Sequence, residues 1–131
     1  MSTRYYLDAA PVIYTVEQVP IYGAAVDARV SAANIICVVS DLTRMECRVK
    51  PLRVGDTELL QDFDDYFDGV VVEVVPLTRE VIDHATEIRA QYGFKTPDAI
   101  HLAAAIVSKC DVFLTNDHRL DRFSAISVEV V

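Results

Sequence analysis

The stretch that decides the fold runs from Lys95 to Leu120 and reads KTPDAIHLAAAIVSKCDVFLTNDHRL. Its first half predicts a helix that Thr96 can cap, with Pro97 at the first helical position, where a missing N–H would be unpaired anyway. Residues 100–107 are too apolar for a surface helix, so we expect this helix to be buried against a sheet. The second half predicts a short strand at 111–114, which stops at Thr-Asn-Asp.

Outward from this stretch, apolar runs alternate with amphipathic segments along the whole chain. We expect further strands at 4–7, 35–39, 70–75 and 128–131, and further helices at 11–14, 24–33, 41–51, 56–67 and 78–93. Strands that read as continuous apolar runs and alternate with helices indicate a parallel sheet covered on both faces. We therefore predict a single α/β domain over residues 1–131, a three-layer α/β/α sandwich around a mainly parallel sheet.

The composition indicates a packed globular domain. The chain has 131 residues, of which 52% are hydrophobic and only four are glycine. No apolar run reaches the length of about 18 residues that a membrane span needs. Asp8 falls where a signal peptide would keep its apolar stretch, so we expect a cytoplasmic protein. Cys37, Cys47 and Cys110 are odd in number and lie in apolar surroundings, which favours reduced core thiols.

The net charge of −8 does not exclude a nucleic-acid partner, because the charges are unevenly distributed. Six acids and no basic residue fall between residues 56 and 68, a pattern typical of a solvated helix face. The basic residues gather elsewhere, at Arg44, Arg48, Lys50, Arg53, Arg119 and Arg122. The charge of the whole chain therefore does not decide the partner.

Four acids lie at or near the ends of the predicted strands. Asp8 and Asp117 follow the first and fourth strands, Glu46 lies in the helix after the second strand, and Asp98 opens the helix before the fourth. If the first and fourth strands are neighbours, all four converge on the carboxyl edge of the sheet, where such folds bind ligands. Hard oxygen ligands without a His/Cys cluster would select Mg²⁺ or Mn²⁺ rather than zinc. Each acid taken alone also fits a helix cap or a turn residue.

The chain resembles a PIN domain of the VapC toxin type along nearly its whole length. The matching blocks are Tyr6-Leu7-Asp8, Ser40 to Glu46, Thr96 to Ala105 and Leu114 to Asp117. The resemblance implies that Asp8, Glu46, Asp98 and Asp117 hold the metal. It also implies an endoribonuclease that leaves a 5′-phosphate and a 3′-hydroxyl, neutralised by a cognate antitoxin. One departure is Ala9, which stands where family members often have Ser, Thr or Asn.

Other residues near these acids have two readings each. Thr115 is expected to orient the Asp117 carboxylate or a water at the metal. Arg44 and Arg48 are candidates for holding phosphate, with a solvated helix face as the alternative. His101, three residues after Asp98, is expected to be a satisfied core histidine rather than a ligand.

The sequence leaves two alternative functions undecided, and it also predicts an interface. A degenerate PIN-like module would hold RNA or protein without cleaving, and a phospho-acceptor receiver domain would also place acids at strand ends. A receiver needs paired acids after its first strand, whereas Asp8 stands alone. An apolar segment near the N-terminus predicts a homodimer contact or an antitoxin groove, together with the helix around Phe63 and Phe67. The alternative is that the residues of this segment are all buried in the core. They are Val12, Ile13, Tyr14, Val16, Val19, Ile21 and Tyr22.

Overall fold

The computed structural model describes residues 1–131 and contains a five-stranded sheet in the order β3-β2-β1-β4-β5. All four strand pairs are parallel. The strands are β1 (Thr3–Leu7), β2 (Ile35–Ser40), β3 (Glu73–Val75), β4 (Val112–Thr115) and β5 (Ser127–Val130). The central strand β1 pairs with β2 on one side and β4 on the other, so that Tyr6 lies opposite both Val38 and Phe113. The first and fourth strands are therefore neighbours, as convergence of the acids requires.

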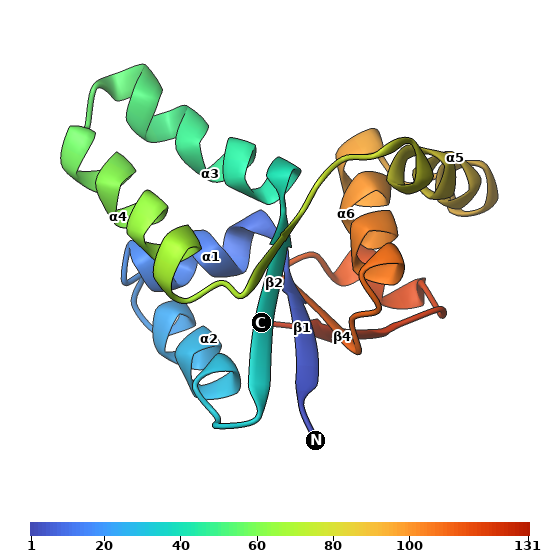
Figure 1. The fold of residues 1–131 in the computed structure, drawn as a ribbon, viewed down its shortest axis with the longest axis horizontal. Coiled ribbons are helices and arrows are strands. Elements are labelled where there is room, and N and C mark those ends of the chain that lie inside the picture. The colour runs from blue at the N-terminus through green and yellow to red at the C-terminus, as the bar shows by residue number, and fades with distance from the viewer.

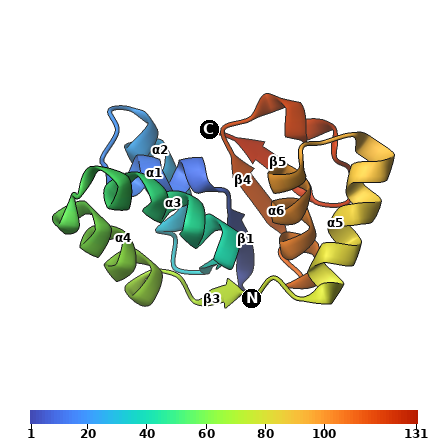
Figure 2. The same cartoon turned by 90° about the horizontal axis from the view of Figure 1, so that it is seen from above.

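Helices cover both faces of the sheet and complete the predicted three-layer sandwich (Figure 2). One face is covered by α1 (Ala9–Val16), α2 (Tyr22–Val30), α3 (Asp41–Val54) and α4 (Thr57–Gly69). The other face is covered by α5 (Arg79–Tyr92) and α6 (Thr96–Val107), and a 3-10 helix, η1 (His118–Arg122), connects β4 to β5. None of these helices combines the length and the apolarity needed to cross a bilayer. The predicted α/β class is confirmed.

Two hydrophobic cores lie on the two faces of the sheet. The core under α5 and α6 has 16 buried residues and includes Tyr6, Leu102 and Phe113. The core under the other four helices has 10 and includes Val12 and Phe63. Apolar burial on both faces is the main favourable contribution to folding, since it scales with the area removed from water. The apolar run in α6 is buried as its composition predicted.

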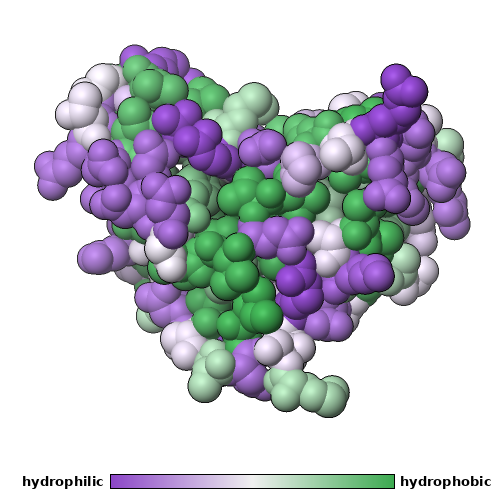
Figure 3. All heavy atoms as spheres, viewed as in Figure 1, coloured by the Kyte–Doolittle hydropathy of each residue, from purple (hydrophilic) through white to green (hydrophobic).

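The carboxyl ends of β1 and β2 meet at the upper edge of the sheet, between α3 and α6 (Figure 1). There Ser40 turns β2 into α3 through a capping box: its Oγ accepts the backbone N–H of Thr43 at 3.4 Å, and Thr43 Oγ1 accepts the N–H of Ser40 at 3.3 Å. On the face of the molecule seen in Figure 1, hydrophobic residues gather near the middle and hydrophilic residues cover the flanking helices (Figure 3).

The helix expected to stop at Pro51 continues to Val54. A proline removes the N–H that would bond the carbonyl four residues earlier in the helix, but Pro51 is buried, and its packing keeps the last turn helical. Gly55 ends the helix instead, in the left-handed conformation with φ of 72°. The N–H of Asp56 then donates to the Pro51 carbonyl at 2.9 Å, closing the turn.

Other boundaries also differ from the sequence prediction. The apolar run at 70–75 forms a strand only at Glu73–Val75, because α4 extends to Gly69 and Val70 caps it. The second helix is Tyr22–Val30 rather than 24–33. Lys95 and not Thr96 precedes the first turn of α6, and no side chain caps that helix.

The apolar segment predicted to form an interface is divided between core and surface. Val12 is fully buried, whereas Ile21 is 82% and Tyr22 is 46% exposed. Phe63 and Phe67 belong to the core beneath α1 to α4, and the expectation that the helix around them joins the interface stays a prediction.

Candidate functional site

Asp8 is held by both of its carboxylate oxygens where β1 ends and α1 begins. Its Oδ1 accepts the backbone N–H of Ala9 at 2.8 Å, and its Oδ2 accepts the hydroxyl of Thr115 at 2.8 Å. Thr115 in turn accepts the backbone N–H of Asp117 at 3.1 Å. Pairing of β1 with β4 brings the Thr115 hydroxyl to the carboxylate of Asp8 rather than to that of Asp117, and the alternative expectation that Thr115 orients a water at the metal stays a prediction.

Glu46 reaches the same place from α3 and meets His101 from α6. His101 Nε2 lies 2.6 Å from Glu46 Oε1 and 3.5 Å from Asp8 Oδ1. The ligand atoms of these three side chains all fall within 4.8 Å of one another. His101 is buried and hydrogen-bonded, as predicted for a core histidine, but it also belongs to the acid cluster. Its position one turn after Asp98, polar in an apolar helix, was the available signal.

A buried hydrogen-bond chain fixes the other side of the His101 ring. Tyr6 Oη lies 2.7 Å from His101 Nδ1 and donates to Ser40 Oγ at 2.8 Å. Tyr6 and Ser40 are both fully buried, and Thr43 Oγ1 lies 3.3 Å from the same phenol oxygen. Hydrogen bonds thus link Ser40, at the start of α3, through Tyr6 and His101 to Glu46 in the same helix.

The charge environment of His101 favours its protonated form. Burial lowers the pKa of His101, but the hydrogen bond to Glu46 and the charges of Asp8, Glu46 and Asp98 outweigh burial, so the net pKa is raised. A doubly protonated ring donates to Glu46 through Nε2 and to Tyr6 through Nδ1. The imidazolium thereby supplies positive charge between two carboxylates.

Asp98 and Asp117 lie outside the tight group of Asp8, Glu46 and His101 but remain electrically coupled to it. The pKa of Asp98 is raised, first by burial and then by the charges of Asp8 and Asp117. The charges of Asp8 and Asp117 thus add to the effect of burial on Asp98.

Asp117 shows the opposite behaviour because Arg119 binds it. Arg119 Nη2 donates to Asp117 Oδ2 at 2.6 Å and Arg119 Nε to Oδ1 at 2.9 Å. The hydrogen bonds from Arg119 hold the pKa of Asp117 below its usual range. Asp117 also caps η1 by accepting the backbone N–H of Arg119 at 2.9 Å. The pKa of Asp117 is therefore shifted in the direction opposite to that of Asp98.

Arg44 and Arg48, the predicted phosphate contacts, both face Asp64 on α4. Arg48 Nε lies 2.9 Å and Arg44 Nη2 3.8 Å from Asp64 Oδ1. These ion pairs tie α3 to α4, so that a phosphate there would have to compete with an existing carboxylate. Their phosphate role stays a prediction.

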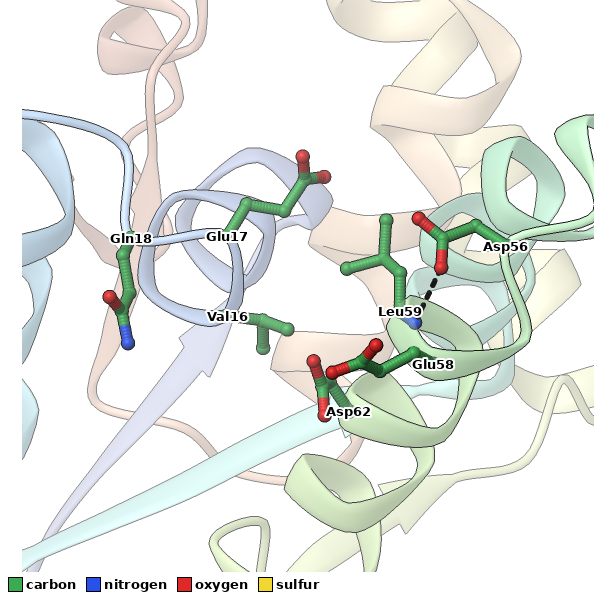
Figure 4. A pocket seen from close by; sticks show the side chains of 7 residues that line it. All are labelled: Val16, Glu17, Gln18, Asp56, Glu58, Leu59 and Asp62. Carbon is green, nitrogen blue, oxygen red and sulfur yellow. Dashed lines mark hydrogen bonds between the residues drawn. The ribbon is translucent and has the colours of Figure 1, made fainter.

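A separate acidic pocket of about 430 Å³ lies between the end of α1 and the start of α4 (Figure 4). Its carboxylates belong to Glu17, Asp56, Glu58 and Asp62. Asp56 caps α4 by accepting the N–H of Leu59 at 3.0 Å, and Glu17 pairs with Lys50 at 3.4 Å. No predicted site residue lines this pocket, and helix capping and a surface ion pair account for two of its acids.

The donor set at the carboxyl edge suits a hard divalent cation. Asp8 and Glu46 offer adjacent oxygens, and the charges of Asp8 and Asp117 add to burial in raising the pKa of the nearby Asp98. Carboxylate oxygens are the ligands that Mg²⁺ and Mn²⁺ prefer. The residues present therefore fit such an ion.

The fold and the site define a class: a parallel α/β domain with acids gathered where the central strands end. Comparison with family models adds the specific result, since the PIN domain model matches residues 5–126. The chain belongs to the PIN domain family. A comparison with curated proteins found no match.

Solved structures share the fold at low sequence identity. VapBC2 of Rickettsia felis, bound to a DNA fragment from its promoter, has a TM-score of 0.78 at 16% identity, over 98% of each chain. DNA-bound VapBC of Salmonella typhimurium has 0.77 at 18%, also over 98% of each chain. VapC20 of Mycobacterium tuberculosis, a toxin that cleaves the sarcin–ricin loop, has 0.69 at 12%, over 83% of this chain and 86% of that one. These likenesses show a common architecture.

Proposed function

We propose that this protein is a metal-dependent endoribonuclease, the toxin of a type II toxin–antitoxin pair. The observation that carries the proposal is the acid cluster at the carboxyl edge of the sheet, where Asp8 and Glu46 meet around His101. Membership of the PIN domain family and the fold shared with VapBC structures support it. The resemblance stated from the sequence assigns the same acids to metal binding.

In this proposal Asp8, Glu46, Asp98 and Asp117 hold Mg²⁺ or Mn²⁺. A bound ion of this kind lowers the pKa of water and stabilises the charge that develops on an attacked phosphodiester. The chain itself contributes position: Thr115 and the Ala9 N–H fix the two oxygens of Asp8. His101 fixes Glu46 from the buried side, so it acts as a positioning residue. Ala9 itself offers no side-chain donor.

Partners follow from the same proposal. The Rickettsia, Salmonella and Klebsiella pneumoniae structures are of toxin–antitoxin proteins, which supports a cognate antitoxin for this chain. We propose RNA as the substrate, and a homodimer that uses exposed apolar residues such as Ile21 and Tyr22. A solution mass equal to one chain at high concentration would contradict the homodimer.

The decisive experiment is incubation of a mixed RNA pool with Mg²⁺, Mn²⁺ or EDTA, followed by mapping of the ends. We expect cleavage with either metal, none with EDTA, and products with 5′-phosphate and 3′-hydroxyl ends. Asp98→Asn should abolish cleavage, whereas Asp68→Asn, which removes an equal charge from the exposed end of α4, should not. RNA that is bound but never cleaved would favour the alternative, an inactive RNA-binding PIN-like module.

A further inference from the structure

We propose that a pocket between the start of α6 and η1 binds the phosphodiester backbone of RNA beside the acid cluster. Three cations line this pocket of about 190 Å³, namely Lys95, Arg119 and Arg122, together with Asp98. The inference rests on the proposed function for the identity of the substrate. The RNA backbone would then bind on the α6 side of the acid cluster, and not at Arg44 and Arg48 on α3.

The guanidinium of Arg122 is fixed in position, but no carboxylate neutralises its charge. Its guanidinium carbon lies 4.3 Å from the centre of the Phe94 ring, and its Nη2 donates to the Tyr92 carbonyl at 2.6 Å. No carboxylate forms an ion pair with it. A stacked guanidinium loses little further freedom on binding, and its remaining N–H groups match the oxygens of a phosphate.

Lys95 supplies a second uncompensated charge from the turn before α6. It is exposed and forms no ion pair, so its ammonium can follow an anion. Arg119 is 67% exposed, and although it binds Asp117 its charge still faces the pocket. Lys95 and Arg122 therefore bring two unpaired positive charges against the single acid of the lining, Asp98, which makes this pocket attractive to a phosphate.

On the α3 side of the acid cluster the basic residues are already paired with an acid. Arg44 and Arg48 share Asp64, and the helix that carries Asp64 bears several further exposed acids. A polyanion is repelled by such a surface and is attracted to unpaired cations. Because Asp98 lines the cationic pocket and is coupled to Asp8, a backbone phosphate held there lies next to the proposed reaction centre.

The test measures RNA binding without catalysis. A labelled single-stranded RNA of about 12 nucleotides is titrated in EDTA at several salt concentrations. The double variant Lys95→Gln/Arg122→Gln should bind at least about tenfold more weakly, because it loses charged contacts. The slope of log affinity against log salt should fall by about 1.4, or about 0.7 for each lost phosphate contact.

The matched control removes the same two charges elsewhere. Lys109 follows the far end of α6 and Arg53 lies near the end of α3; both are exposed and unpaired. Lys109→Gln/Arg53→Gln should keep the parent slope. Arg122→Lys, which keeps the charge and removes the fork, should also keep the slope, and this separates charge from any loss of stability. Thermal melts establish that each variant is folded.

Three results would overturn the inference: an unchanged slope in the Lys95/Arg122 variant, an equal drop in the control, or no RNA binding by the parent in EDTA. None of these depends on cleavage. A parent that binds RNA through this pocket but does not cleave it with metal would refute the nuclease proposal and leave the backbone site standing. Cleavage with an unchanged slope would do the opposite.

Discussion

Replacing Tyr6 by Phe removes one oxygen from the centre of the buried network. The ring is fully buried and keeps its place under this change, stacked on Phe113 with centroids 5.3 Å apart, so no cavity opens. The lost oxygen lies 2.7 Å from His101 Nδ1 and 2.8 Å from Ser40 Oγ. Leaving a buried polar group unpaired costs about 1–3 kcal/mol, and more when the group is charged. We expect a loss of about 2–4 kcal/mol in the free energy of unfolding.

Urea denaturation in EDTA measures this loss, with Tyr92→Phe as the matched control. Tyr92 Oη meets only Ser124 Oγ, at 3.2 Å near the surface, so its removal should change the free energy by less than about 0.5 kcal/mol. The dependence on urea should stay the same in both variants, because neither changes the area exposed on unfolding. RNA cleavage by folded Tyr6→Phe should also fall, since His101 holds Glu46.

A Tyr6→Phe loss below about 0.5 kcal/mol, with an unchanged urea dependence, would refute this reasoning. It would mean that His101 and Ser40 find other partners and that the phenol oxygen does not fix the imidazole. A large loss in Tyr92→Phe as well would show that the measurement reports tyrosine removal in general.

Three further outcomes are expected. Asp98→Asn should stabilise the fold in EDTA near neutral pH, because a raised pKa in the folded state means that folding disfavours the ionised carboxylate; urea melts test this. Asp117, with its lowered pKa, should stabilise the fold above its unfolded pKa of about 4 and lose that contribution as the pH falls through the folded value, and Arg119→Gln should remove this dependence in acid melts. Cys37 and Cys47, buried with raised pKa values, should resist alkylation until urea unfolds the domain.

The elements that could be predicted from the sequence are those whose signal is local. The apolar run of β2 and the Ala103–Ala105 segment of α6 are buried, because a continuous apolar stretch has few other stable places. Boundaries were less predictable. Pro51 stays helical because the tertiary packing of α3 outweighs the loss of one backbone hydrogen bond, and no single-residue preference reveals that.

The approach of Asp8 and Glu46 to each other could be predicted from the sequence, whereas the contacts around them could not. Asp8 and Glu46 were found because strand ends in a parallel sheet gather at one edge. The contacts of His101 join residues 55 and 95 positions apart, to Glu46 and Tyr6, and depend on how α3 and α6 approach each other. The partner of Thr115 was equally unpredictable, because pairing of β1 with β4 brings it to Asp8, which lies 107 positions away in the chain.

The charges at the carboxyl edge are compensated unequally, and this singles out Asp98. When protonated, His101 supplies positive charge to Asp8 and Glu46, while Arg119 neutralises Asp117. Asp98 has no ion pair, and its pKa is raised by burial and by the other acids. A divalent cation that enters this edge therefore gains most from the charge on Asp98. If Mg²⁺ stabilises the parent through this charge, it should raise the melting temperature of Asp98→Asn far less than that of the parent. Equal shifts in the two proteins would place the ion elsewhere.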